Sequence, residues 1–205
     1  FFGRINYSIA DKYLFTGTFR ADGSSRFGPE NQYGFFPSGA FAWQIGEEDF
    51  IGESVSTLKL RLSAGLIGNQ EGLGYGNFVA RQRFSGIGTT ENNQVFQNGL
   101  SIVATDVPDL KWETTAQTDF GIDYGFLRNR INGEIDYYQK KTTDLLLAKT
   151  LPASSGYTSV TENVGILENK GWEFVINSGN LVGEFKWNTS FNIAGNNNKI
   201  LQLGA

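Results

Sequence analysis

The chain of 205 residues contains no cysteine, no histidine and no methionine. Disulfide bonds are therefore excluded, as are metal sites built from thiolate or imidazole ligands. No run of about 18 apolar residues is present, which argues against a transmembrane helix. Charged residues make up 19% of the chain, less than the roughly one quarter that is typical. We expect neither a metal nor a cofactor.

Positive charge is scarce as well. The formal net charge is −4 and no basic run occurs, so the chain lacks the phosphate-neutralising surface of a nucleic-acid-binding protein. It also lacks the basic start and apolar core of a signal peptide. The sequence opens instead with Phe1, Phe2, Gly3 and Arg4, which already has the character of a strand. We therefore expect both ends of this sequence to be cuts within a longer protein.

What the sequence has in abundance is alternation of apolar and polar residues. Leu58, Leu60 and Leu62 alternate with Lys59 and Arg61. Because neighbouring side chains of a strand point to opposite sides, a strand here has one apolar and one polar face. Comparable alternation predicts eight strands, at residues 4–10, 13–21, 37–45, 58–66, 114–125, 131–140, 171–178 and 184–194.

The connections between these strands differ strongly in length. Short or intermediate connections are predicted at residues 11–12, 46–57, 127–130 and 181–183. Long ones are predicted at residues 22–34, 68–113 and 141–170, of which 68–113 is expected to be irregular. Bacterial membrane barrels combine short periplasmic turns with longer extracellular loops. The pattern predicts an all-β fold, an antiparallel transmembrane β-barrel fragment of about eight strands, with the long loops outside the cell.

Two other interpretations stay open at this point. A soluble β-sandwich also alternates, with its apolar face turned inward, and periodicity does not reveal which face is wet. Such a sandwich would serve as a carbohydrate-binding module that transports nothing. A passive porin would also have such a wall, without a plug domain in its lumen.

Several motifs in the loops resemble a known family. The segment 20–28, which reads RADGSSRFG, resembles the R-x-D-G-S-S-R-F-G segment of SusC/RagA-type TonB-dependent outer-membrane transporters. Each further motif is weak alone, but the series follows the family order along nearly the whole chain. These motifs lie at residues 36–38, 58–61, 68–70, 108–113, 136–138, 141–146, 163–165 and 168–173.

The resemblance implies a section of a larger barrel of about 22 strands, whose lumen is closed by a plug domain. Residues 1–205 would all belong to this barrel domain, with the plug domain and the barrel termini outside the chain. Members of the family import oligosaccharides or peptides, with a SusD-like lipoprotein as an extracellular lid and energy supplied through TonB. By this resemblance the chain is no enzyme, and it lies in contact with lipid in the outer membrane of a Gram-negative bacterium.

Five residues in the loops are candidates for ligand binding: Asp22, Arg26, Asn69, Gln70 and Trp112. Asp22 and Arg26 offer a carboxylate and a guanidinium to a sugar or an ion, but Asp and Ser also stabilise their own loops by bonding local amides. Asn69 and Gln70 could likewise bind a ligand or stabilise their own loop. Trp112 is suited to stack on a sugar ring, yet a Trp at the start of a strand is also typical of an interfacial anchor.

Glu134 and Asp136 are candidates for a different chemistry. They are expected on one strand face, about 6.6–6.8 Å apart along the strand, and two carboxylates can perform acid/base catalysis in glycoside hydrolysis. The alternative is a lumen wall in which both carboxylates pair with neighbouring Lys and Arg side chains. The sequence favours the wall, because it shows neither a cleft nor the supporting residues that a catalytic site needs.

Overall fold

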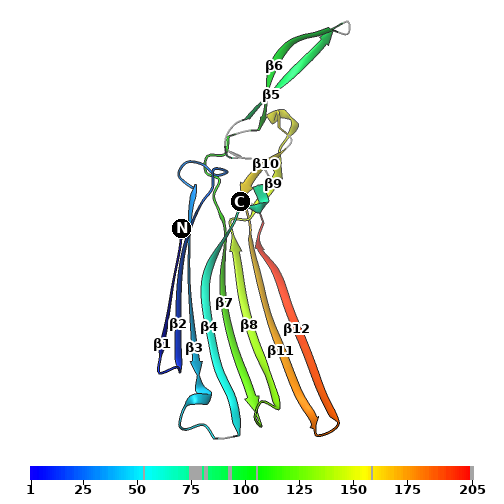
Figure 1. The fold of residues 1–205 in the computed structure, drawn as a ribbon. Helices are drawn as coiled ribbons and strands as arrows, with labels where there is room; N and C mark the ends of the chain where they lie inside the picture. The colour runs from blue at the N-terminus through cyan, green and yellow to red at the C-terminus, as the bar shows by residue number, and fades with distance from the viewer. Residues whose placement is uncertain are drawn as a thin grey trace.

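The computed structural model describes residues 1–52, 54–73, 80, 83–91, 94–104, 106–157 and 159–203. Eight strands lie side by side in one antiparallel sheet (Figure 1), in the order β1-β2-β3-β4-β7-β8-β11-β12. Their bounds are β1 Phe2–Ile9, β2 Tyr13–Gly23, β3 Tyr33–Gln44, β4 Val55–Asn69, β7 Glu113–Phe126, β8 Ile131–Thr143, β11 Ile166–Val182 and β12 Lys186–Gln202. Each predicted strand corresponds to one of these eight.

Two further hairpins lie within the long connections. β5 (Arg83–Glu91) pairs with β6 (Gln94–Ala104), and β9 (Leu146–Thr150) pairs with β10 (Ser159–Asn163). The prediction that residues 68–113 are irregular is therefore wrong over β5 and β6. Their pairing contains two register shifts, and each shift interrupts the period of two that reveals a strand in a sequence.

The remaining elements are short 3₁₀ helices: η1 Ile45–Glu47, η2 Glu71–Leu73 and η3 Ala153–Ser155. Within the described part of the chain, no helix is long and apolar enough to cross a membrane.

The short connections lie together at one end of the sheet, and the long ones lie at the other (Figure 1). Ala10 and Asp11, between β1 and β2, both have positive φ, at 51° and 54°. This combination is typical of a type I′ turn, whose twist matches that of a tight hairpin. Between β7 and β8, three successive residues, Leu127 to Asn129, also have φ between 54° and 59°. Left-handed conformations are unfavourable for Ala10, Leu127 and Arg128, although Asp and Asn adopt them more readily, so the pairing of the flanking strands helps to hold both turns.

One face of the sheet is apolar from edge to edge. Side chains that lie opposite one another on neighbouring strands form rows, and two successive rows of this face cross all eight strands. The first row consists of Ile9, Tyr13, Trp43, Leu60, Ile122, Ile135, Phe174 and Ile193. The second consists of Tyr7, Phe15, Phe41, Leu62, Phe120, Tyr137, Trp172 and Gly195. Leu62 is 40% exposed, so the sheet offers a wide apolar surface to its surroundings.

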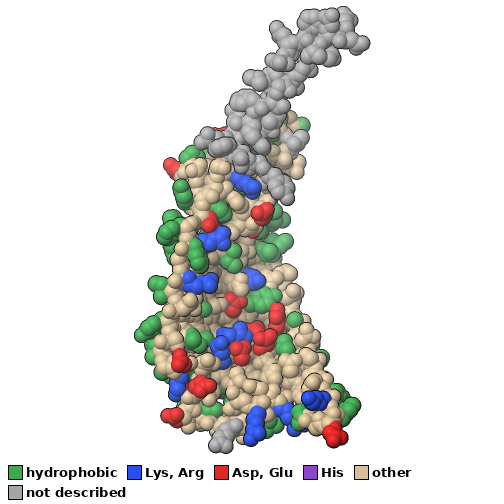
Figure 2. Space-filling view, viewed as in Figure 1, with side chains coloured by type: hydrophobic (Ala, Val, Ile, Leu, Met, Phe, Trp, Pro, Cys, Tyr) green, Lys and Arg blue, Asp and Glu red, His purple; other side chains and the backbone are tan. Residues whose placement is uncertain are grey.

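The opposite face is polar. The row between the two apolar ones includes Arg61, Asp136 and Glu173 on this side. Figure 2 shows blue and red side chains next to one another at mid-height of the viewed face, whereas green side chains project mainly from its margins. This separation of apolar and polar faces is the arrangement that a barrel wall between lipid and an aqueous lumen requires.

Pro37 marks the position where β3 separates from β4. β3 pairs with β2 along its length, but its pairing with β4 is confined to Ser38–Gln44. Because proline has no backbone N–H to donate, a ladder of hydrogen bonds ends readily at that residue. Beyond it, the ring of Phe36 lies over Gly68, where a Cβ would approach the ring to 1.9 Å. Glycine is required there for the ring to fit.

The buried side chains of the described residues gather mainly among the long connections. Phe27, Leu73, Ala80, Leu110 and Leu146 form one cluster, against which Val107 and Trp112 pack. Phe27 and Leu110 are only 2% and 1% exposed. The members come from all three long connections, so these loops share a small hydrophobic core, which we call the loop core.

Candidate functional site

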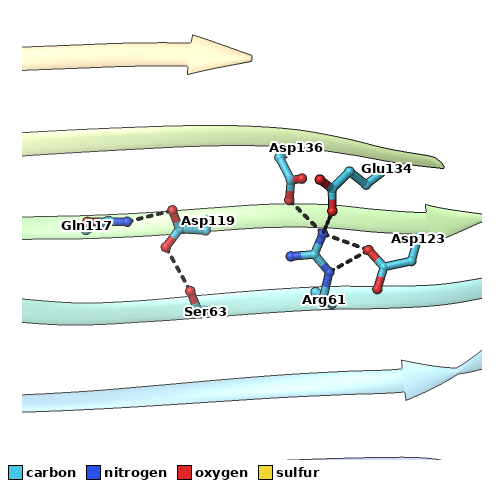
Figure 3. Close-up of polar contacts among 7 residues, drawn as sticks. All are labelled: Arg61, Ser63, Gln117, Asp119, Asp123, Glu134 and Asp136. Carbon is cyan, nitrogen blue, oxygen red and sulfur yellow. Dashed lines mark hydrogen bonds and ion pairs between the residues drawn. The ribbon is translucent and has the colours of Figure 1, made fainter. Parts of the chain in front are cut away.

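The polar face has a dense group of charges around Arg61 on β4 (Figure 3). Arg61 Nη2 lies 2.7 Å from Asp123 Oδ1, 2.9 Å from Asp136 Oδ1 and 3.8 Å from Glu134 Oε2. Gly121 makes room for the guanidinium, because a Cβ there would meet Arg61 Cζ at 2.8 Å. Arg61 thus draws three carboxylates from two other strands together.

A second carboxylate group lies beside this cluster on the same face. Asp119 accepts hydrogen bonds from Ser63 Oγ at 2.8 Å and from Gln117 Nε2 at 2.7 Å (Figure 3). These carboxylates are thus held by donors from their own strand, from the adjacent strand or, for Asp136, from Arg61 two strands away. For Glu134 and Asp136 this arrangement favours the lumen wall over the acid/base pair. In the described part of the chain, no group of three or more acidic side chains is arranged to hold a metal ion.

Towards β12 the polar face becomes rich in asparagine and serine. Asn177 Nδ2 donates to Asn132 Oδ1 at 3.2 Å, and Ser190 Oγ donates to Asn177 Oδ1 at 2.7 Å. Asn169 Nδ2 also donates to Asn198 Oδ1. Amide and hydroxyl groups both donate and accept hydrogen bonds without carrying charge. This part of the wall is suited to hydroxyl-rich or peptide groups.

At the end with the short connections, Glu48 joins separate parts of the chain. Its Oε2 lies 2.9 Å from Lys12 Nζ, and its Oε1 accepts hydrogen bonds from Tyr13 Oη at 2.8 Å and Trp43 Nε1 at 3.0 Å. The hydrogen bonds from Lys12, Trp43 and Tyr13 lower the pKa of Glu48 from 4.5 to about 2. The carboxylate is therefore ionised at neutral pH and ties the β3–β4 connection to the β1–β2 turn.

Side-chain hydrogen bonds join the long connections at the other end. Asn163 Nδ2 donates to the carbonyl oxygen of Lys111 at 2.7 Å, and the Lys111 amide donates to Asn163 Oδ1 at 2.9 Å. Glu113 accepts from Asn69 Nδ2 at 3.0 Å and from the Leu146 amide at 3.2 Å. These bonds link the second long connection with the third, directly around the loop core.

Close contacts also join the first long connection to the second. The ring centroids of Phe27 and Trp112 are 4.8 Å apart, and those of Phe36 and Trp112 are 5.5 Å apart in an edge-on arrangement. A Cβ on Gly28 would lie 1.9 Å from the carbonyl oxygen of Pro108, so the two backbones approach as closely as only glycine permits. The three loops therefore present one joined surface rather than separate strands of chain.

Two of the predicted ligand residues, Asn69 and Trp112, make contacts that join the long connections. Asn69 bonds Glu113, and Trp112 packs on Phe27 rather than lying at a lipid interface. Asp22 lies apart from them, at the end of β2, where its Oδ2 is 2.5 Å from Arg20 Nε.

Arg26 and Gln70 flank the loop core. The Arg26 amide donates to Ser24 Oγ at 3.3 Å, and the Arg26 carbonyl oxygen accepts from the Ala80 amide at 3.0 Å. Gln70 Oε1 and Trp112 Nε1 are buried, and no hydrogen-bond partner for either lies within the described residues. Ligand binding by the five predicted residues stays a prediction.

Sequence reasoning missed the residues that form the loop core. Phe27, Leu73 and Leu110 are single apolar residues in polar or glycine-rich segments, and Leu146 lies in a short run of three leucines. They form no period of two or of 3.6, so no pattern in the sequence marked them. The available signal was their position inside or beside the family motifs.

Comparison with known proteins agrees with this geometry. The family described as "TonB dependent receptor-like, beta-barrel" matches residues 1–199. The chain is 42% identical over 214 residues to the TonB-dependent receptor SusC of Bacteroides thetaiotaomicron, which covers 99% of the chain and 21% of SusC. It is 43% identical over 205 residues to the TonB-dependent receptor P3 of Formosa agariphila, covering 98% of the chain and 20% of that receptor. The chain thus spans about a fifth of the length of these relatives.

A solved structure of the RagAB peptide transporter superimposes with a TM-score of 0.88 at 30% identity, covering 99% of this chain and 22% of that one. The "open-open" state of the RagAB peptide importer gives a TM-score of 0.85. The predicted fold class, a fragment of an antiparallel transmembrane barrel, is confirmed, and so is the outer membrane as its location. The β-sandwich interpretation is thereby excluded. This chain belongs to the TonB-dependent receptor β-barrel family and is similar to its SusC and RagA members.

Proposed function

We propose that the chain is part of the wall of an active importer that takes oligosaccharides or peptides through the outer membrane. A SusD-like lipoprotein would cover the outer end, and TonB would supply the energy through parts of the complete receptor outside residues 1–205. The observation that carries this proposal is the sheet itself, which is apolar across all eight strands on one face and polar on the other. The peptide transporter RagAB, named for its cargo, supports it.

The two ends of the sheet have different parts in this proposal. The loop core holds three long connections in one surface at the outer end, where a lid protein would dock. The polar face would line the lumen, with carboxylates around Arg61 and neutral amides on β11 and β12. Neither part performs covalent chemistry, so selection would depend on hydrogen bonding and charge.

The proposal is tested by uptake in cells that lack the complete receptor. We expect such cells to lose uptake of one labelled oligosaccharide or peptide class, and expression of the receptor to restore it. Removing TonB should abolish the restored uptake, because import against a gradient needs energy. A passive porin would restore uptake equally well without TonB, and that outcome would contradict active import.

The orientation of the wall has its own test. Ser154, in the middle of η3, is exposed, and Gly183, in the β11–β12 turn, has open space around its Cβ position. We expect a cysteine at Ser154 to react with a membrane-impermeant maleimide on whole cells. A cysteine at Gly183 should react only after lysis, since short turns face the periplasm. The unsubstituted receptor gives the background, and the reverse pattern would invert the orientation.

A further inference from the structure

The apolar face of the sheet, which would face the lipid and which we call the outward face, changes from apolar to charged between β4 and β12. In a single row of this face, Leu66 on β4 and Ala116 on β7 are followed by Lys141, Glu168 and Lys199 on β8, β11 and β12. The row therefore runs from apolar to charged within five strands. In the preceding row, Lys170 on β11 occupies the position next to Trp172 on the same face.

The period of two along each strand places these side chains on the outward face, and two contacts of Glu168 agree with it. Gln139 and Lys141 follow Tyr137 at intervals of two along β8, and Lys170 and Glu168 precede Trp172 at the same interval, so all share one face. Gln139 Nε2 donates to Glu168 Oε2 at 3.0 Å, and Lys170 Nζ lies 3.0 Å from Glu168 Oε1.

The charges of this group do not balance. Lys141, Lys170 and Lys199, which we call the outer lysine belt, share one carboxylate, that of Glu168, for a formal charge of +2 (3 − 1). Glu168 is already engaged by Lys170. Lys141 and Lys199 are exposed, and neither has an ion-pair partner among the residues that the structure describes. Two ammonium groups are therefore available to an anion.

The position of the belt identifies the region of the membrane. Barrel strands tilt by about 35–45° from the barrel axis, so a membrane boundary crosses the rows obliquely. On β2 and β3 the outward side chains stay apolar as far as Phe19 and Phe35. On β8 and β11 they become polar directly beyond Tyr137 and Trp172. The belt lies just past the apolar band, at the end with the long connections, which is the headgroup level of the outer leaflet.

We propose that the outer lysine belt binds the phosphate groups of a phosphorylated glycolipid in the outer leaflet. Its acyl chains would lie against the apolar rows that contain Tyr137 and Trp172. Lysine ammonium groups bind phosphate as point charges, and basic side chains near an anionic membrane surface attract its headgroups. Aromatic rings at the boundary anchor a strand at the same level. The proposal rests on the outward orientation of the long connections, and it is independent of what the receptor imports.

The test uses the complete receptor in phosphatidylcholine nanodiscs that contain a small fraction of bisphosphorylated lipid A. Native mass spectrometry measures how much lipid A stays bound. We expect each of Lys141→Gln and Lys199→Gln to weaken binding about fivefold, in line with roughly 1 kcal/mol for each basic residue. The triple variant with Lys170→Gln should lose more than about 20-fold. Raising the salt concentration should reduce the difference, because salt screens exposed charges.

Lys140→Gln is the matched control, since Lys140 lies on the same strand but turns to the opposite face, 5.1 Å from the Tyr138 ring centroid. It should bind lipid A as the unchanged receptor does.

Lipid A without phosphates should bind the triple variant and the unchanged receptor equally. If the triple variant and the unchanged receptor bind bisphosphorylated lipid A equally, the proposal is overturned. Full competition by millimolar inorganic phosphate would also overturn it, because that would indicate a free anion as the ligand. The single variants decide the question if the triple variant fails to assemble, and none of these measurements depends on transport.

Discussion

Leu62→Arg is expected to prevent most of the receptor from assembling in the outer membrane, whereas Ser63→Arg is expected to assemble. Leu62 lies in the middle of the apolar row, between Phe41 and Phe120. Arginine at a lipid-facing position near the bilayer midplane costs about 2–4 kcal/mol. Ser63 faces the polar side and bonds Asp119, so an arginine there gains a carboxylate partner. Adjacent residues of one strand should thus respond in opposite ways.

The measurement is the amount of folded receptor in outer-membrane fractions, read from its resistance to unfolding in detergent before heating. Leu62→Phe separates a lipid-facing position from a protein core. Lipid accepts the larger ring, whereas a packed interior loses about 1–3 kcal/mol through overpacking. We expect Leu62→Phe to assemble like the unchanged receptor. If Leu62→Arg assembles as well as Ser63→Arg, the assignment of the two faces is wrong.

These opposite responses also explain why the strands were predictable. On β4 the identity of the face depends only on whether a residue is odd or even, and Lys59, Arg61 and Ser63 keep that order without interruption. A membrane wall has no packed interior, so the polarity of each side chain depends mainly on whether it faces lipid or water. A pattern of single residues is then enough to locate a strand and its two faces.

The ends of the strands were harder to predict, for the same physical reason. β11 begins at Ile166, whereas alternation predicted its start at 171. Glu168 and Lys170 lie beyond the apolar band, where both faces of the strand meet polar surroundings. The ladder of backbone hydrogen bonds continues there, but the sequence no longer alternates. Alternation therefore marks the membrane-spanning part of a strand and not its full length.

For the candidate site, the sequence showed which residues to consider but not which residues they contact. The motifs singled out Asn69 and Trp112. In the structure Trp112 packs on Phe27 of the loop core, and Asn69 donates to Glu113. The ion pairs of Arg61 depend on carboxylates of β7 and β8, which the register of the strands brings beside it. Contacts between loops distant in sequence have no periodic signal, which is why the loop core required the structure.

Phe27→Ala is expected to separate the long connections from one another while the sheet stays intact. Phe27 is 2% exposed and packs on Trp112. Replacing a buried Phe by Ala costs about 3–5 kcal/mol, and a cluster of so few side chains has little other packing to compensate. The strands are held by their own backbone ladders, so the loss should remain local.

Hydrogen exchange of the complete receptor measures this separation directly. The Ala80 amide donates to the Arg26 carbonyl at 3.0 Å, and the Val107 amide donates to the Ala80 carbonyl at 2.9 Å. In Phe27→Ala both amides should exchange about two to four orders of magnitude faster, as the lost packing energy predicts, while amides in the middle of β7 and β8 should keep their protection. Phe50→Ala is the matched control, because Phe50 lies 72% exposed in the β3–β4 connection at the opposite end. Unchanged exchange at Ala80 and Val107 would show that the hydrogen bonds of Asn163 and Glu113, and not Phe27, hold the loops together.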